Sequence, residues 1–452
     1  MENSGTSSQA DLLPLSRDAA MKPRWFTSKR LLLLVILNLI AVLCYLVVGW
    51  GSSSFAHVLT IVYSSPDSRS YRSVADWIYG ARPSAQESAW RPFLYPLLQG
   101  LAARLGGILG VWLLNVALWF LTLNVTAAAT FRFVKSSWVA ALVFLVLATN
   151  VSLILLTFHG LTEITVVALL AVWIYGLSHL TSRPTASQVA WALLPVSLLT
   201  VVKPEFEILL AAMFVVLVAL VVRSPERGLA AGVFGACLIP VAIQLALEAH
   251  FNGFFGISTI GERTFRAYFL SRLDVFIGDS STMQVARTKV LGLSNLDSYR
   301  FALDHFGDSV LVFFYTLREN LLTGTNFLPN HPKIRAALLI AVLAQFVVLI
   351  AMIPLVVVAL WRARDGRLAL LCIGTLTIFL AGGLTFTQGD RITVVAFPLW
   401  LVALVLAVKE AGGVELWLML KARLRPPSTL MMRPATDAPV STPGAGNATP
   451  RN

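Results

Sequence analysis

Residues 65–100 read SPDSRSYRSVADWIYGARPSAQESAWRPFLYPLLQG, and they form the first long polar stretch after the first hydrophobic run of the chain. The stretch combines a carboxylate with several arginines and aromatic rings, whereas the runs around it are apolar. Apolar runs of about twenty residues are typical of membrane-spanning helices. We therefore expect this stretch to lie outside a bilayer that its neighbours cross, and any chemistry of the chain to start there.

The composition excludes an ordinary soluble domain. Of 452 residues, 57% are hydrophobic and only 13% are charged, and the mean hydropathy is +0.76. A net charge of +12 would suggest nucleic acid in a soluble protein, but here much of it lies in short segments beside apolar runs. Such charges set membrane topology. We therefore expect the chain to lie in a lipid bilayer and not to bind nucleic acid. The three cysteines, Cys44, Cys237 and Cys372, all lie in apolar runs and indicate small buried hydrophobes.

The apolar runs predict an all-α polytopic membrane protein with about ten transmembrane helices. Lys29 and Arg30 precede the first run, and the short turns on the same side also carry basic residues, which places both termini in the cytoplasm. The expected spans are 31–50, 107–131, 138–156, 161–180, 189–202, 206–222, 229–247, 336–360, 368–386 and 392–407.

The expected organisation is a membrane domain with two long outer loops. The polar N-terminus and the Pro-, Ser- and Thr-rich C-terminus have compositions typical of disorder. The divisions are a cytoplasmic arm at 1–30, a membrane domain at 31–409 with a first outer loop at 51–92 and a second at 248–335, and a cytoplasmic tail at 410–452.

Both outer loops are expected to carry amphipathic helices. Helical spacing of apolar residues predicts one from about Pro66 to Tyr79, with Ser65 as its N-cap. Similar pieces are expected at 265–273 and 310–322, and 93–105 is too short for a full span and suits an interfacial or re-entrant segment.

Several motifs occur in a fixed order along the chain. Asp67, Tyr71 and Ala75 form an Asp-x-x-x-Tyr-x-x-x-Ala pattern, and 91–96 reads Arg-Pro-Phe-Leu-Tyr-Pro. Leu-Thr-Glu at 161–163, Lys-Pro at 203–204 and Gly-Asp-Arg at 389–391 follow. In this order the motifs resemble the multi-pass, C-type glycosyltransferase superfamily, which includes protein O-mannosyltransferases and aminoarabinose transferases. The mannosyltransferase branch usually has an adjacent acidic pair, whereas Ser68 follows Asp67 here.

The resemblance implies a polyprenyl-phosphate sugar donor and inverting transfer at the outer face. Such a displacement needs one base and positive charge for the leaving phosphate. Asp67 is the candidate base; the alternative is a carboxylate that only favours the first turn of a helix. Arg91, Arg391 and Lys203 are candidate phosphate ligands, and the alternative for the arginines is snorkelling at the membrane edge.

Further candidates line the expected site. Tyr71, Tyr95, Glu163 and Glu262 are expected to line the substrate site, although aromatic residues at a membrane edge also form interfacial belts. By their place in the second long loop, Arg263 and His331 could line it together with Glu262. His159 and Glu163 are four residues apart and could share a divalent cation with the donor. The alternative is a carboxylate that is hydrogen-bonded within the bundle, so the sequence leaves the metal open.

Three functions remain compatible with the sequence. The first is a glycosyltransferase that moves a sugar to an unknown glycan, lipid or protein acceptor. The second is a transporter or flippase of a lipid-linked sugar, and the third is a non-catalytic scaffold of a glycan-assembly complex. The resemblance to bacterial members suggests the plasma membrane of a bacterium, with the active side extracytoplasmic.

Overall fold

The computed structural model describes residues 28–412 except 84, 324–331, 364–365, 386–387, 390 and 392–393. Within these ranges every regular element is a helix, which confirms the all-α class. Most of the expected cytoplasmic arm and tail, 1–27 and 413–452, lies outside the described residues.

The first half of the described chain contains the first long polar loop, three long apolar helical segments and three shorter apolar helices. Its helices are α1 (Ser28–Gly51), α2 (Val58–Ile61), α3 (Pro66–Ile78), η1 (Gln86–Ala89), α4 (Leu94–Val134), α5 (Ser137–Ala148), α6 (Val151–Leu156), α7 (Glu163–His179), α8 (Ala186–Thr200), η2 (Pro204–Phe206) and α9 (Glu207–Val221).

The second half contains the second long loop and the last apolar helices. Its helices are α10 (Arg227–Cys237), α11 (Ile239–Asn252), α12 (Ile260–Thr264), η3 (Phe265–Leu270), α13 (Ser271–Phe276), α14 (Met283–Leu291), α15 (Asn295–Asp304), α16 (Phe306–Leu322), α17 (Pro332–Ala363), α18 (Gly366–Leu384), η4 (Val394–Ala396) and α20 (Phe397–Glu410).

The chain is an integral membrane protein. Among the described residues, six helical segments are long and apolar enough to cross a membrane: Leu31–Gly51, Leu94–Val134, Pro204–Val221, Arg227–Asn252, Ile334–Arg362 and Gly366–Leu384. The helices α5, α7 and α8 are apolar but shorter. Most of α1 is exposed along its apolar length, as expected for a helix whose solvent is lipid.

One expected span is interrupted, and one long helix is bent where the sequence predicts a boundary. The run 138–156 is two helices, α5 and α6, because the side chain of Asn150 accepts a hydrogen bond from the Leu153 amide (3.0 Å) and starts a new helix. The segment 94–134 bends at Gly106 and Gly107, where Gly107 has a φ of 61° that favours glycine. The short piece before this bend is therefore distinct from the span after it, as the sequence indicates.

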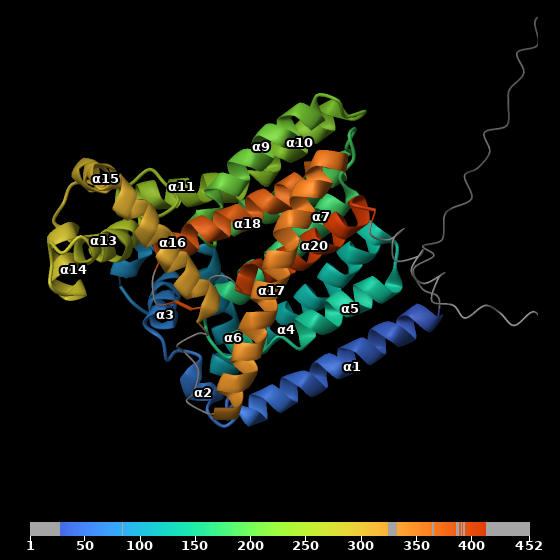
Figure 1. Cartoon of the computed structure of the whole chain (residues 1–452), viewed down its shortest axis with the longest axis horizontal. Helices are drawn as coiled ribbons and strands as arrows, with labels where there is room; N and C mark the ends of the chain where they lie inside the picture. Colours follow the sequence, from blue (N-terminus) through green and yellow to red (C-terminus); the bar gives the residue numbers. More distant parts are fainter. Residues whose placement is uncertain are drawn as a thin grey trace, which may run out of the picture.

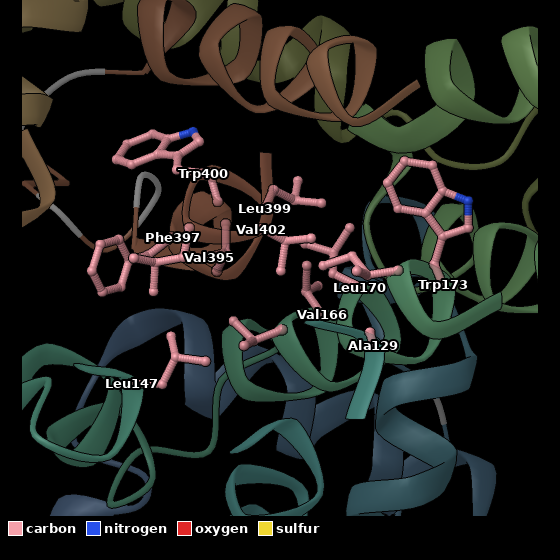
Figure 2. Packing of buried hydrophobic residues seen from close by; sticks show 14 of the residues in the cluster. Ala129, Leu147, Val166, Leu170, Trp173, Val395, Phe397, Leu399, Trp400 and Val402 are labelled. Carbon is pink, nitrogen blue, oxygen red and sulfur yellow. The ribbon is translucent and has the colours of Figure 1, made fainter. Parts of the chain in front are cut away.

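The core of the bundle surrounds α7. This helix is buried on nearly all sides and packs against α4 and α8. Figure 2 shows Phe397 and Trp400 of α20 in the same cluster as Val166 and Trp173 of α7. Because α7 is enclosed, its first residue, Glu163, is held at a fixed place inside the protein.

The two long loops meet at one end of the bundle. Figure 1 shows α3 of the first loop at the same end as α13, α14 and α15 of the second. The loops are joined directly, since the amide and the hydroxyl of Thr259 both donate to the carbonyl oxygen of Ala89, at 3.1 and 2.8 Å. The polar parts of the chain therefore form one surface above the apolar helices.

Candidate functional site

A cavity of 670 Å³ lies where the two loops meet the membrane helices. Its walls come from α3, the start of α7, the corner before η2, the end of α18 and the elements α12, η3 and α14. Of the candidate residues from the sequence, those lining it are Asp67, Tyr71, Arg91, Glu163, Lys203 and Arg391. Segments far apart in the chain therefore bring these six side chains to one place.

Asp67 is fixed by the helix that carries it and by two arginines. The Ser65 hydroxyl oxygen accepts a hydrogen bond from the Ser68 amide (3.0 Å), and with Pro66 it starts α3, so that Asp67 lies in the first turn. Arg91 Nη2 donates to Asp67 Oδ1 at 2.5 Å, and Arg391 Nη1 donates to Oδ2 at 2.7 Å. Each carboxylate oxygen thus receives a charge-assisted hydrogen bond.

Arg91 is held in place from two sides. Its Nε donates to Ser70 Oγ at 2.9 Å and its Nη1 to the Tyr71 hydroxyl at 3.0 Å. The guanidinium also lies over the Tyr71 ring, 4.3 Å from the ring centre. The side chains of α3 therefore orient Arg91 toward Asp67.

Arg391 joins Asp67 to a deeper carboxylate. Its Nε lies 2.6 Å from Glu163 Oε1, and the two side chains are only 6% and 2% exposed. Gln388 Oε1 accepts a further hydrogen bond from Arg391 Nη1 at 3.1 Å. The arginine thus satisfies a buried charge that would otherwise be very costly.

Lys203 completes the network of ion pairs. Its Nζ lies 3.8 Å from Glu163 Oε1 and 3.5 Å from Glu205 Oε1. The second oxygen of Glu163, Oε2, is buried without a hydrogen-bond partner among the described residues. Arg391 and Lys203 therefore share one oxygen of Glu163 and leave the other free to accept.

The ion pairs shift the pKa of Asp67. Burial alone would raise it, but the guanidinium groups of Arg391 and Arg91 outweigh burial and lower the pKa to about 2. For Lys203, burial opposes the charge, yet the neighbouring Glu205 and Glu163 raise the pKa above its usual value. Both groups are therefore charged at neutral pH.

Three candidates from the sequence do not line the cavity. Tyr95 is buried behind Tyr71, with ring centres 5.0 Å apart. Glu262 pairs with Arg266 along its own helix. His159 is buried at the turn before α7, where its carbonyl oxygen accepts a hydrogen bond from Asn115 (2.8 Å). Asp390 of the Gly-Asp-Arg motif and His331 lie outside the described residues.

The cavity also contains cations that the motifs do not identify. Arg263 and Arg287 line it from the second loop. The Arg263 guanidinium lies 4.1 Å from the centre of the Trp90 ring, and that of Arg287 lies 5.2 Å from the centre of the Tyr268 ring. In the described part of the chain, neither forms an ion pair with a carboxylate, whereas Arg91, Arg391 and Lys203 all do. Only its place beside Glu262 in the second long loop pointed to Arg263, and no motif pointed to Arg287.

The divalent cation that the sequence left open has few candidate ligands among the described residues. No group of three His, Cys, Asp or Glu side chains close enough to hold a metal ion occurs within the described ranges. Of the two candidates, Glu163 is already paired with Arg391 and Lys203, and His159 does not line the cavity.

Fold and site together define an all-helical integral membrane protein with a polar cavity that contains a buried network of ion pairs. No family model matches the chain, and no curated protein matches it. A solved structure that is similar is the crystal structure of ArnT from Cupriavidus metallidurans bound to undecaprenyl phosphate. The identity is 12%, the TM-score is 0.39, and the match covers 87% of this chain and 81% of that one. A similarity of this extent assigns neither a family nor an activity.

Proposed function

We propose that this protein is a GT-C-like membrane glycosyltransferase, which moves a sugar from a polyprenyl-phosphate donor to an acceptor at the extracytoplasmic face. The observation that carries the proposal is that Asp67, Arg91, Glu163, Lys203 and Arg391, singled out by ordered motifs in the sequence, line one cavity. The two long loops, which the positive-inside rule places on the outer side, form its upper walls.

The proposed reaction is a single displacement with inversion. The acceptor oxygen or nitrogen forms a bond to the anomeric carbon of the sugar, while the bond from that carbon to the phosphate oxygen breaks. The polyprenyl phosphate leaves with the bonding electrons, and Asp67 takes the proton of the acceptor. Cationic side chains stabilise the charge that develops on the phosphate.

The resting network holds Asp67 in a form that is too weakly basic for this task. Both of its oxygens accept hydrogen bonds from arginines, and its pKa is about 2. A donor phosphate competes with the carboxylate for Arg91 and Arg391, because a guanidinium forms strong charge-assisted hydrogen bonds with phosphate oxygens as it does with carboxylate oxygens. In this proposal, donor binding loosens Asp67 from its arginines and raises its basicity next to the acceptor.

The donor phosphate has further ligands available. Arg263 and Arg287 face the cavity and, among the described residues, are not neutralised by a carboxylate. An anion that binds them breaks no ion pair among the described residues, whereas an anion at Arg91 or Lys203 must weaken an existing one. We therefore add both arginines to the proposed phosphate ligands.

A non-catalytic scaffold is the second candidate, and one observation favours it. Arg91, Arg391 and Lys203 are all paired with carboxylates of the same cavity, as in a network that only stabilises the fold. Pairing alone therefore does not separate the two functions. Replacement of Asp67 separates them, because a scaffold tolerates the loss of a base.

The test is a comparison of cells that lack the protein with cells that receive the wild type, Asp67→Asn or Asp304→Asn at matched membrane abundance. The expected result is that wild type and the exposed control Asp304→Asn restore a missing surface sugar. With Asp67→Asn the sugar stays absent and the lipid-linked donor accumulates, since loss of a general base lowers rates by about 10²- to 10⁴-fold. Restoration by Asp67→Asn would exclude Asp67 as the base and favour the scaffold or a transporter.

A further inference from the structure

A second pocket, of 270 Å³, lies between α3 and the first part of α4. Its lining includes Arg72, Asp76 and Tyr79 from α3 and its C-terminal end, together with Gly100 and Arg104 from α4. Asp67, Ser70 and Tyr71 line the larger cavity from a different face of the same helix. The second pocket is therefore separate from the candidate site.

Arg104 is held at this pocket by Tyr79. The guanidinium lies 4.6 Å from the centre of the Tyr79 ring and donates a hydrogen bond to the carbonyl oxygen of the same residue. Tyr79 is itself fixed, because its hydroxyl donates to the Leu97 carbonyl at 2.9 Å and its ring packs on Gly100. A Cβ atom at Gly100 would come within 2.4 Å of that ring. The position of Arg104 thus depends on several specific contacts.

Arg72 supplies a second cation to the pocket. Its guanidinium lies 4.8 Å from the centre of the Tyr63 ring, which also lines the pocket. Its Nε is 3.7 Å from Asp76 Oδ2, and both side chains are well exposed, at 52% and 40%. Ion pairs of this kind are weak in water, so a phosphate can replace Asp76 as the partner of Arg72.

A row of exposed leucines runs beside Arg104. Leu97, Leu101 and Leu105 are 43%, 48% and 81% exposed, and their four-residue spacing places them on one face of α4. Arg104 lies seven residues after Leu97 and therefore borders the same face. The row lies before the bend at Gly106 and Gly107, in the first part of the apolar segment Leu94–Val134. A short apolar helix of this kind lies at the membrane interface with its apolar face in hydrocarbon, so the leucines meet lipid where the pocket presents positive charge.

We propose that this pocket binds the headgroup of an anionic phospholipid. Arg72 and Arg104 contact the phosphate, the tyrosines shield the ion pairs from water, and an acyl chain lies along Leu97, Leu101 and Leu105. The leucine row is the reason to assign a lipid and not a free phosphate ester. The proposal goes beyond sugar transfer and does not depend on it.

The test is native mass spectrometry of the purified full chain in detergent with equal amounts of phosphatidylglycerol and phosphatidylcholine. The expected result is preferential retention of phosphatidylglycerol by the wild type. The double variant Arg72→Gln, Arg104→Gln should weaken that retention by about tenfold or more, since it removes two charge-assisted contacts. Arg69→Gln removes an exposed charge from α3 outside the pocket and should retain the lipid as the wild type does.

Two further measurements distinguish binding of a lipid from non-specific binding of phosphate to the arginines. Leu101→Asn leaves both arginines in place and should also reduce phosphatidylglycerol retention, because it disturbs the acyl contact. Excess sn-glycerol 3-phosphate, a soluble headgroup, should not displace the lipid. Equal retention by the double variant, or full displacement by the soluble ester, would overturn the proposal.

Discussion

Arg391 donates a hydrogen bond to Asp67 over 2.7 Å, although 324 positions separate the two residues in the chain. The same guanidinium binds Glu163 at 2.6 Å. One side chain near the C-terminal end thus joins the first loop to the start of the central helix α7. The network is therefore both part of the candidate site and a link between distant parts of the fold.

Loss of Arg391 is expected to destabilise the protein strongly. Arg391→Gln leaves Glu163 buried, with Lys203 at 3.8 Å as its remaining cation. Breaking a buried ion pair from one side typically costs about 3 to 5 kcal/mol. The melting temperature of the purified protein in detergent checks this.

A double-mutant cycle separates the ion pair from other effects of the substitution. Glu163→Gln should partly rescue Arg391→Gln, because it removes the charge left without its main partner. If the double variant loses as much stability as the two single variants added together, Arg391 and Glu163 are not coupled.

The low pKa of Asp67 predicts a defined loss of stability in acid. A carboxylate whose pKa falls from its usual 3.8 to about 2 on folding contributes stability that is fully present above pH 3.8. That contribution disappears as the pH falls through about 2. The difference in unfolding free energy between wild type and Asp67→Asn should therefore be constant from pH 5 to 7 and shrink below pH 4. An unchanged difference down to pH 2 would contradict the pairing with Arg91 and Arg391.

The starts of helices could be predicted from short stretches of sequence. Ser65 and Pro66 specify the start of α3, which begins where the sequence indicates. The interruption of 138–156 also had a local signal, Asn150, but a continuous apolar run hides a capping residue when hydropathy is averaged. Helix starts thus follow from a few neighbouring residues.

The partners of the charged residues could not be predicted in the same way. The pairing of Asp67 with both Arg91 and Arg391 depends on how α3, α7 and the segment before η4 pack, and no short pattern contains that information. Arg287 illustrates the limit, because it reaches the cavity only through the packing of α14 against η3. Sequence order indicates which residues matter, and packing decides what they contact.

Arg263 and Arg287, for which the described part of the chain supplies no carboxylate partner, should control donor affinity in the proposed reaction. Arg263→Gln and Arg287→Gln are each expected to raise the KM for a polyprenyl-phosphate sugar by about tenfold, since a charge-assisted hydrogen bond contributes about 1.5 to 3 kcal/mol. Turnover at saturating donor should change much less. Arg300→Gln, which removes an exposed charge on α15, is the matched control. A loss of kcat with an unchanged KM would place these arginines outside donor binding.

Close packing of α7 and α8 leaves no room for a side chain at Gly176. A Cβ atom at Gly176 would lie 2.1 Å from the carbonyl oxygen of Trp191, which is backbone and cannot move aside, so Gly176→Ala must separate the two helices. Overpacking of this kind costs about 1 to 3 kcal/mol.

Gly235→Ala in α10 is the matched control, because a Cβ there meets no atom within 4 Å. In a helix interior that change should be neutral or stabilising by about 0.5 to 1 kcal/mol. Thermal unfolding of both variants in the same detergent measures the contrast, and equal melting temperatures would show that α7 and α8 do not pack this closely.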